Sequence, residues 1–194
     1  GARELTQGRW KDIRIKHGGI KQTLSEPHSP WQNRAEAGIR DLKTHVQNSM
    51  HKTRAPKRLW DYCALYVADI RSRMAQPFRR LGNRTPWEHV TGDTPDISEW
   101  LEYAWYDWCW YHDTGTFIQN EPRKLGKWLG VAHRIGTCLS YWILTAKATV
   151  IVHTTVQPLN DPEYRDPLVR DCIAEYDTAV RTSLDQKDRK STRL

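Results

Sequence analysis

The spacing of the apolar residues changes near residue 100, and this change favours folds in which helices precede strands. Five apolar residues recur at intervals of three or four within residues 34–51: Ala35, Ile39, Leu42, Val46 and Met50. That spacing is typical of one buried helix face, and residues 57–75 show it again. Later, residues 102–113 are aromatic and alternate as a strand does, and residues 126–136, 139–145 and 148–156 are predicted to be further short strands. The predicted fold class is therefore α+β, with the strands forming a small antiparallel β-barrel.

Local signals predict the remaining elements. These are a helix at 3–16, a short strand at 20–27, one or two helical turns at 85–92, a tight hairpin turn at Ala146-Lys147 and a linker at 160–166. Residues 167–184 are predicted to form a last amphipathic helix. Its expected inward residues are Leu168, Cys172, Ile173, Tyr176 and Val180. The polar tail, residues 185–194, is predicted to be disordered.

Positive charge is concentrated in the first part of the chain. The net charge is +7, yet residues 1–84 hold 18 Lys and Arg against 7 Asp and Glu, a balance of +11. Residues 85–159 have a balance of −3 and residues 160–194 a balance of −1. A basic segment favours a polyanionic partner such as nucleic acid, although basic helices that are merely solvated are also common.

The cysteines and the apolar runs exclude several classes of protein. The four cysteines lie far apart, and the histidines do not join them at metal-ligand spacings, which disfavours a zinc site and a disulfide framework. We therefore expect buried, reduced thiols in an intracellular protein. The longest apolar runs are only a few residues long, so neither a membrane span nor a signal peptide is expected.

Two groups of residues in the strand region leave alternatives open. Trp105, Trp108 and Trp110 belong to the alternating aromatic segment and either stack on bases or, as we favour, pack in the core. Lys124, Lys127 and Arg134 stand where strands meet loops, and for these cations contact with phosphate and simple solvation are equally acceptable.

The stretch SEPHSPWQNRAEAGIRDLK, residues 25–43, places a carboxylate and two cations on one helix face. Asn33 is a good N-cap, and Arg40 and Lys43 follow Glu36 at intervals of four and seven residues. Glu36 and Asn33 could form a capping box, with Arg40 as an ion-pair partner of Glu36. Alternatively, Glu36 holds a divalent metal while the two cations lie along a phosphate backbone, an arrangement that suits metal-assisted phosphoryl transfer.

The segment SPWQNRAEAGIRDLK resembles the last catalytic motif of retroviral and retrotransposon integrases. In that family, a Gln four residues before the Glu precedes a helix with basic residues four and seven positions after the Glu, as Gln32, Glu36, Arg40 and Lys43 do here. The resemblance implies a ribonuclease-H-like core in which two Asp and one Glu hold Mg²⁺ or Mn²⁺. It makes Glu36 the catalytic metal ligand. The DNA-binding residues that it implies are Gln32, Asn33, Arg34, Arg40 and Lys43.

The resemblance extends to copia-type elements over roughly residues 1–159. RTPWEHVTGDTPDISEW, KLGKWLGVAHRIG and YWILTAKATVIVHTTVQPL are similar to successive segments of those integrases. The resemblance implies that the chain starts just after the second catalytic Asp, so that both aspartates would be absent. The expected domains are a partial ribonuclease-H-like core at 1–54, a helical connector at 55–101, a five-stranded antiparallel barrel at 102–159, and a linker, helix and tail at 160–194.

The resemblance implies an integrase parent that joins DNA strands by transesterification, acts as a homo-oligomer and works in the nucleus or in cytoplasmic virus-like particles. This chain would then bind DNA, at element ends and targets, without catalysing the reaction alone. The alternative is a non-enzymatic module that binds nucleic acid or protein. A ribonuclease-H-like nuclease would share the Glu36 helix but does not predict the copia-like segments.

Overall fold

The computed structural model describes residues 9–17, 34–75, 81–113, 123–133 and 135–191. The chain divides into two compact units, residues 1–44 and residues 45–194. The first unit contains α2 (Arg9–Lys16) and the start of α3 (Arg34–Thr53), a helix that continues into the second unit. The strand predicted at 20–27 lies outside the described residues.

The helices predicted from the 3-4 spacing are confirmed at α3 and at the pair formed by η2 (Lys57–Leu59) and α4 (Trp60–Arg73). The apolar stripe of α3 becomes more buried along the helix, since Ile39 is 53% exposed and Val46 only 9%. In the second unit α3 packs on α4, where the Cys63 thiol lies 3.9 Å from the Val46 carbonyl oxygen. Cys63 and Val67 form the buried side of α4.

Two short helices follow α4. They are α5 (Pro86–Thr91), which Thr85 caps and Gly92 ends at a φ of 85°, and α6 (Ser98–Leu101). The Arg73 guanidinium connects them to α4, because it lies 4.8 Å from the centre of the Trp87 ring and 4.1 Å from that of Trp100. Such contacts are cation–π interactions, and they fix both short helices against the end of α4.

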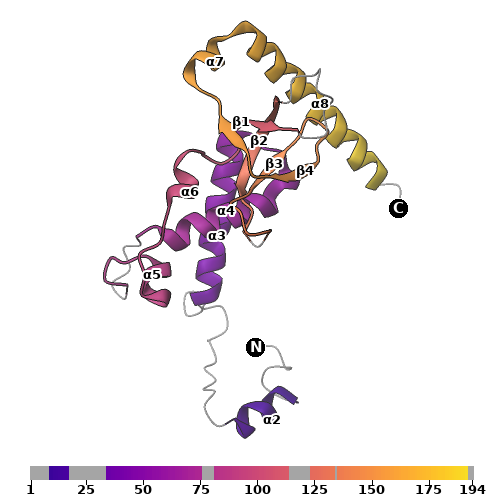
Figure 1. The fold of residues 1–194 in the computed structure, drawn as a ribbon. Helices are drawn as coiled ribbons and strands as arrows, with labels where there is room; N and C mark the ends of the chain where they lie inside the picture. The colour runs from indigo at the N-terminus through magenta and orange to yellow at the C-terminus, as the bar shows by residue number, and fades with distance from the viewer. Residues whose placement is uncertain (1–8, 18–33, 76–80, 114–122, 134, 192–194) are drawn as a thin grey trace. The chain divides into compact units, whose positions relative to one another are not determined.

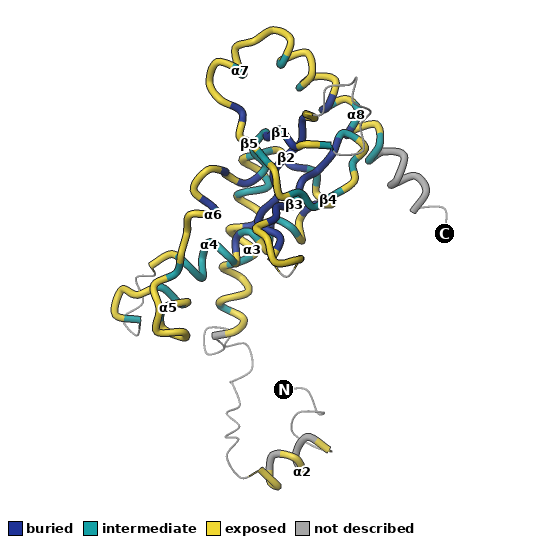
Figure 2. The backbone as a smooth tube through the Cα atoms, in the orientation of Figure 1, coloured by how far each residue is buried: buried dark blue, intermediate teal, exposed yellow. Residues whose placement is uncertain are grey.

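The five strands form one antiparallel sheet with the order β4-β3-β2-β1-β5 (Figure 1 and Figure 2). Their bounds are β1 Trp108–His112, β2 Arg123–Val131, β3 Tyr141–Leu144, β4 Val150–His153 and β5 Val156–Pro158. The predicted hairpin between β3 and β4 is confirmed. Ala148 takes a φ of 52° there, and its amide donates to the Thr145 carbonyl at 2.9 Å.

The sheet is strongly curled. β4 and β5 occupy opposite edges, yet only two residues separate His153 from Val156. Three Cα steps reach at most about 11 Å, whereas the edges of a flat five-stranded sheet lie about 19 Å apart. The Tyr111 and His153 rings accordingly meet at 5.2 Å between centroids, although β1 and β4 are not neighbours in the sheet.

The central strand β2 is buried on both faces from Leu125 to Val131, the dark blue part of its course in Figure 2. Trp128 points into the main core, where the Tyr66 ring of α4 lies 5.7 Å away. The preceding residue, Lys127, faces the opposite side because successive strand residues alternate. That side is covered by α8 (Pro167–Ser191), which follows α7 (Asp161–Arg165). Tyr176 and Val180 are the buried residues of α8.

Several predicted boundaries are wrong. Residues 102–107 precede β1 without belonging to it, because Tyr106 has a φ of 67° that breaks the extended backbone. The expected linker contains α7, which Asn160 and Glu163 cap reciprocally. α8 continues to Ser191, past the predicted start of the tail. Closure of the sheet into a barrel is not confirmed, since the strand order is that of an open sheet.

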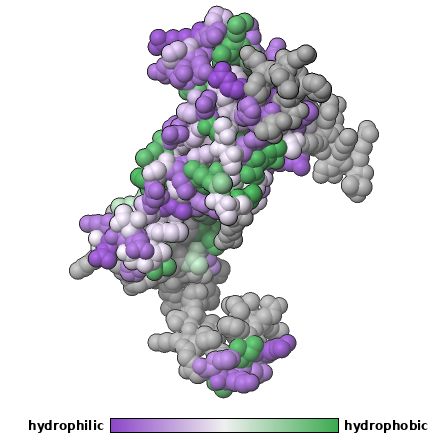
Figure 3. All heavy atoms as spheres, in the orientation of Figure 1, coloured by the Kyte–Doolittle hydropathy of each residue, from purple (hydrophilic) through white to green (hydrophobic). Residues whose placement is uncertain are grey.

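The first part of α8 is more exposed than predicted. Leu168 is 74% exposed and Cys172 is also exposed, while Ile173 is half-buried. The visible face over α7 and the start of α8 is mostly hydrophilic (Figure 3). Among the cysteines, Cys63 and Cys109 are buried as expected, but Cys138 and Cys172 are exposed.

Replacing Tyr176 by phenylalanine is expected to lower the free energy of unfolding by about 1 to 2 kcal/mol. The Tyr176 hydroxyl is buried and donates to the Leu144 carbonyl oxygen at 2.7 Å, which joins α8 to the end of β3. Urea denaturation measures the change, with Tyr164→Phe, at a 38% exposed tyrosine, as the control. Equal stability of both variants would show that the hydroxyl does not hold α8 on the sheet.

Candidate nucleic-acid interface

The predicted carboxylate and cations lie on α3. Glu36, Arg40 and Lys43 are all exposed, and their spacing along one continuous helix places them on the same face. Arg34 is the first residue of α3. Gln32 and Asn33 lie outside the described residues, and so does the capping box that Asn33 would complete.

A metal centre is not assembled within the described residues. No group of three or more His, Cys, Asp or Glu side chains there could hold a metal ion. Mg²⁺ in a phosphoryl-transfer site needs several oxygen ligands, and Glu36 supplies one carboxylate. The described part of the chain therefore does not fit Mg²⁺ or Mn²⁺ by itself.

The tryptophans that could have stacked on bases are used in packing. Trp105 is only 3% exposed, and the Trp108 ring meets Tyr176 edge-on at 5.0 Å between centroids. The Arg123 guanidinium lies 5.7 Å from the centre of the Trp110 ring. These contacts favour the core interpretation over an open stacking platform.

The three cations of the strand region have different surroundings. The Lys124 ammonium forms an ion pair with Asp113, whereas Arg134 lies outside the described residues. Lys127 is 7% exposed, so it is neither solvated nor at a rim.

Lys127 lies at a pocket of about 700 Å³ within the second unit, here called the basic pocket. Its charged lining residues are Arg54, Lys57, Arg58, Lys127, Asp177 and Arg181. They come from the corner between α3 and α4, from β2 and from α8. Five cations against one carboxylate make a strongly positive pocket, and its size is in the range of ligand sites.

The Lys127 ammonium lies on two aromatic faces. It is 3.5 Å from the centre of the Trp108 ring and 4.7 Å from that of Tyr106. Burial lowers the pKa of this ammonium from 10.5 to about 8, against the opposing attraction of Asp177 and Asp107. An anion that entered the pocket would stabilise the charged form.

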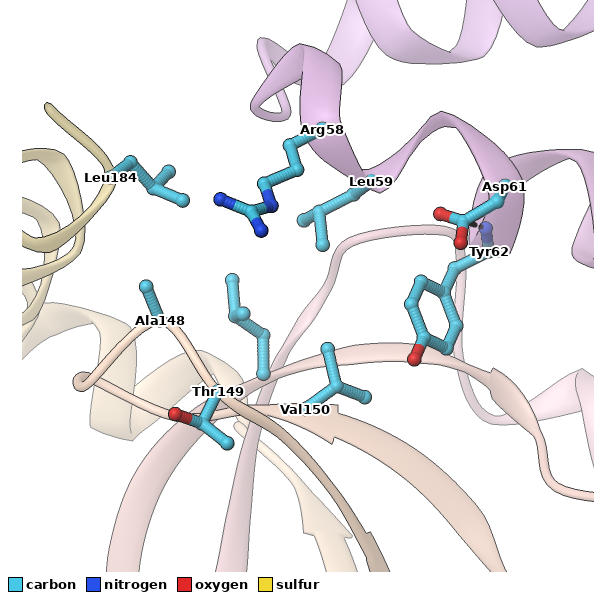
Figure 4. A pocket seen from close by; sticks show the side chains of 9 residues that line it. Arg58, Leu59, Asp61, Tyr62, Ala148, Thr149, Val150 and Leu184 are labelled. Carbon is cyan, nitrogen blue, oxygen red and sulfur yellow. Dashed lines mark hydrogen bonds between the residues drawn. The ribbon is translucent and has the colours of Figure 1, made fainter. Parts of the chain in front are cut away.

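Arg58 also lines a second pocket of about 320 Å³, beside Leu184 and the β3–β4 hairpin. Figure 4 shows its guanidinium directed into the space between Leu184 and Ala148. On the far side, the Asp61 carboxylate accepts from the Tyr62 amide at 2.9 Å. Arg58 and Leu184 border both pockets.

Sequence reasoning missed most of the basic pocket. Residues 54–58, RAPKR, hold three cations in five positions, but nothing in that segment alone connects them to Lys127 or Arg181. Arg54 takes a φ of 55° there, which ends α3 and redirects the chain. The other signal was Lys127 within the segment LGKWLGV, residues 125–131, where every other residue is apolar or glycine. A lysine is rarely buried without a partner.

No known family model, curated protein or solved structure matches this chain. Within the part of the chain that the structure describes, no helix is long and apolar enough to cross a membrane.

Proposed function

We propose that this chain is part of a copia-type retrotransposon integrase and that it binds DNA through the first half of α3. The observation that carries the proposal is the exposed row of Glu36, Arg40 and Lys43 on one continuous helix. Both cations are exposed, so a polyanion that follows the helix could contact them. The +11 balance of residues 1–84 supports the same partner.

In the proposed parent, Glu36 would be one of three carboxylates that hold Mg²⁺ or Mn²⁺ for strand transfer. Gln32, Asn33 and Arg34 would hold DNA together with the two cations of α3. Residues 1–54 would belong to a ribonuclease-H-like core, and the curl of the sheet supports a barrel at 102–159. The parent would act on DNA as a homo-oligomer, in the nucleus or in virus-like particles.

Changing Arg40 and Lys43 together to alanine is expected to flatten the salt dependence of DNA binding. Each lost phosphate contact reduces the slope of log affinity against log salt by about 0.9, so the double variant should lose about 1.8. Fluorescence anisotropy with a labelled duplex at several salt concentrations measures the slope. The total charge falls by two units, so a matched control is needed.

Lys147→Ala with Arg165→Ala is that control, because both residues are exposed and both lie outside α3. We expect the control to keep the slope of the unchanged protein. If both double variants flatten it equally, only total charge matters. If the α3 variant keeps the full slope, the cations of α3 are a solvated face and the proposed interface fails.

A non-enzymatic module that binds nucleic acid or protein is the second candidate. The basic pocket favours it, because that pocket is built entirely from residues 53–184 and needs no carboxylate of a catalytic centre. Binding that persists in the Arg40→Ala, Lys43→Ala variant with an unchanged salt slope would support this candidate.

A further inference from the structure

We infer that the basic pocket is a binding site for a ligand that carries two or more neighbouring phosphate groups. The basic pocket contains none of Glu36, Arg40 and Lys43, so it can be tested independently of the proposed function.

The first support is the convergence of charge. Arg54 and Arg58 reach the pocket from the corner between α3 and α4, Lys127 from the middle of β2, and Arg181 from α8. Like charges brought together by separate elements repel each other, and Asp177 is the one carboxylate among the lining residues. A multiply charged anion removes that repulsion, because each phosphate group offers several strong acceptor oxygens to these donors.

The second support is the position of Lys127. Its ammonium is withdrawn from water at 7% exposure, and in the described part of the chain it contacts two rings and forms no ion pair. A buried cation is ordinarily paired with an anion. Asp177 and Asp107 attract the ammonium without forming an ion pair with it. Lys127 lines the pocket wall, so an anion that occupies the pocket can supply a direct partner.

The aromatic walls indicate that charge, rather than a base, is recognised. One face of Trp108 is covered by the Lys127 ammonium, and its ring also meets Tyr176 edge-on at 5.0 Å. Tyr106 is likewise occupied by the same ammonium. Stacking on bases needs an open aromatic face. The ligand is therefore recognised by its phosphates.

The size of the pocket indicates more than one phosphate group. About 700 Å³ exceeds what a single phosphate fills, and the cations line it from three sides. A short polyphosphate and the backbone of a nucleic-acid strand share this chemistry of closely spaced phosphates. The two sources differ in length, which the experiment uses.

Isothermal titration of the full chain with sodium tripolyphosphate tests the site. We expect binding that Lys127→Met weakens at least tenfold, and that Arg181→Gln at the exposed rim also weakens. Lys124→Met is the matched control, because Lys124 lies on the same strand, pairs with Asp113 and does not line the pocket. Its affinity should stay within twofold of the unchanged protein.

A second arm uses a short labelled single-stranded oligonucleotide. If tripolyphosphate displaces it and Lys127→Met weakens it, the ligand is a strand backbone. If only tripolyphosphate binding depends on Lys127, the ligand is a small polyphosphate, and the inference holds in both cases. It is overturned if neither ligand binds, or if Lys124→Met and Lys127→Met weaken binding equally. Near-ultraviolet circular dichroism of each variant shows that the fold is retained.

Discussion

Replacing Gly126 by alanine is expected to lower the free energy of unfolding by about 3 kcal/mol, the upper end of the usual effect of overpacking a core. A β-carbon at this position would lie 2.6 Å from Cγ2 of Ile143, and 3.1 Å from both the Leu144 carbonyl oxygen and Cδ1 of Tyr111. Real β-carbons do not approach other atoms as closely as 2.6 Å. One of the strands must therefore shift.

The surroundings of Gly126 leave little room for that shift. Ile143 is fully buried and branched at its β-carbon, so its Cγ2 cannot turn away without a change of rotamer. Leu144 contributes a backbone atom of the adjacent strand β3. Tyr111 belongs to the main core on β1. The glycine is needed because three strands approach one another at β2.

Urea denaturation of the purified variant measures the loss, and two further variants interpret it. Gly38→Ala on α3 has open space around its new β-carbon, so it should not lower the stability, since alanine favours helix. Adding Ile143→Ala to Gly126→Ala removes the clashing atom, so the double variant should lose less than the two single losses added together. A Gly126→Ala chain as stable as the unchanged protein would mean that β2 and β3 pack less closely.

The elements that could be predicted from the sequence are those in which one periodic stripe decides the structure. α3 and α4 follow from apolar residues at 3-4 intervals, and the strands at 141–144 and 150–153 follow from short apolar runs. These patterns are local, so they do not depend on how the chain folds back.

The wrong predictions concern segments whose residue pattern does not match their actual structure. The aromatic residues of 102–107 alternate, yet Tyr103 and Trp105 are buried from an irregular segment that Tyr106 turns through a positive φ. The Asn160 and Glu163 pair was a readable capping box, and the two residues at 161–162 include the proline that often begins a helix. The predicted strand at 148–156 is interrupted at Thr154-Thr155, between β4 and β5. No glycine or proline signals that interruption.

The row of residues on α3 and the basic pocket also differ in whether local sequence could predict them. The row of Glu36, Arg40 and Lys43 could be predicted because a helix converts sequence spacing directly into position on one face. The basic pocket could not, because it joins residues 54–58 to Lys127 and Arg181 across long stretches of chain. Only the tertiary fold brings those cations together.

Lys127 is expected to make the stability of the protein depend on pH. Burial lowers the pKa of its ammonium from 10.5 to about 8, so the folded state holds this proton more weakly than the unfolded chain. Below pH 8 both states are protonated and the folded protein carries the full penalty of a buried charge. Between about pH 8 and 10.5 the unfolded chain keeps a proton that the folded protein has lost, and stability from this group therefore rises with pH.

The size of this effect follows from the shift. A lowering of about 2.5 pKa units corresponds to about 3 kcal/mol, and the contacts with Trp108 and Tyr106 offset about 1 kcal/mol of it. The opposing charges are Asp177 and Asp107. Burial of Cys63 and Cys109 acts in the other direction, because it raises their thiol pKa values to about 11 and 12 and so lowers stability above pH 9.

Lys127→Met separates the lysine from Cys63, whose pKa depends on burial alone. The Lys127 charge lowers the pKa of Cys109, so that thiol's contribution changes together with the lysine. We expect the methionine variant to be about 2 kcal/mol more stable at pH 7, because it fills the same space without a buried charge. The advantage should shrink steadily between pH 8 and 10.5, as the lysine of the unchanged protein loses its proton on folding. Urea denaturation of both proteins at intervals from pH 7 to 10.5 measures the difference.

A constant difference over that range would mean that Lys127 stays charged in the folded protein, held by its two rings and by Asp177. A methionine variant less stable at pH 7 would mean that the contacts of the ammonium with Trp108, Tyr106 and Asp177 outweigh its desolvation.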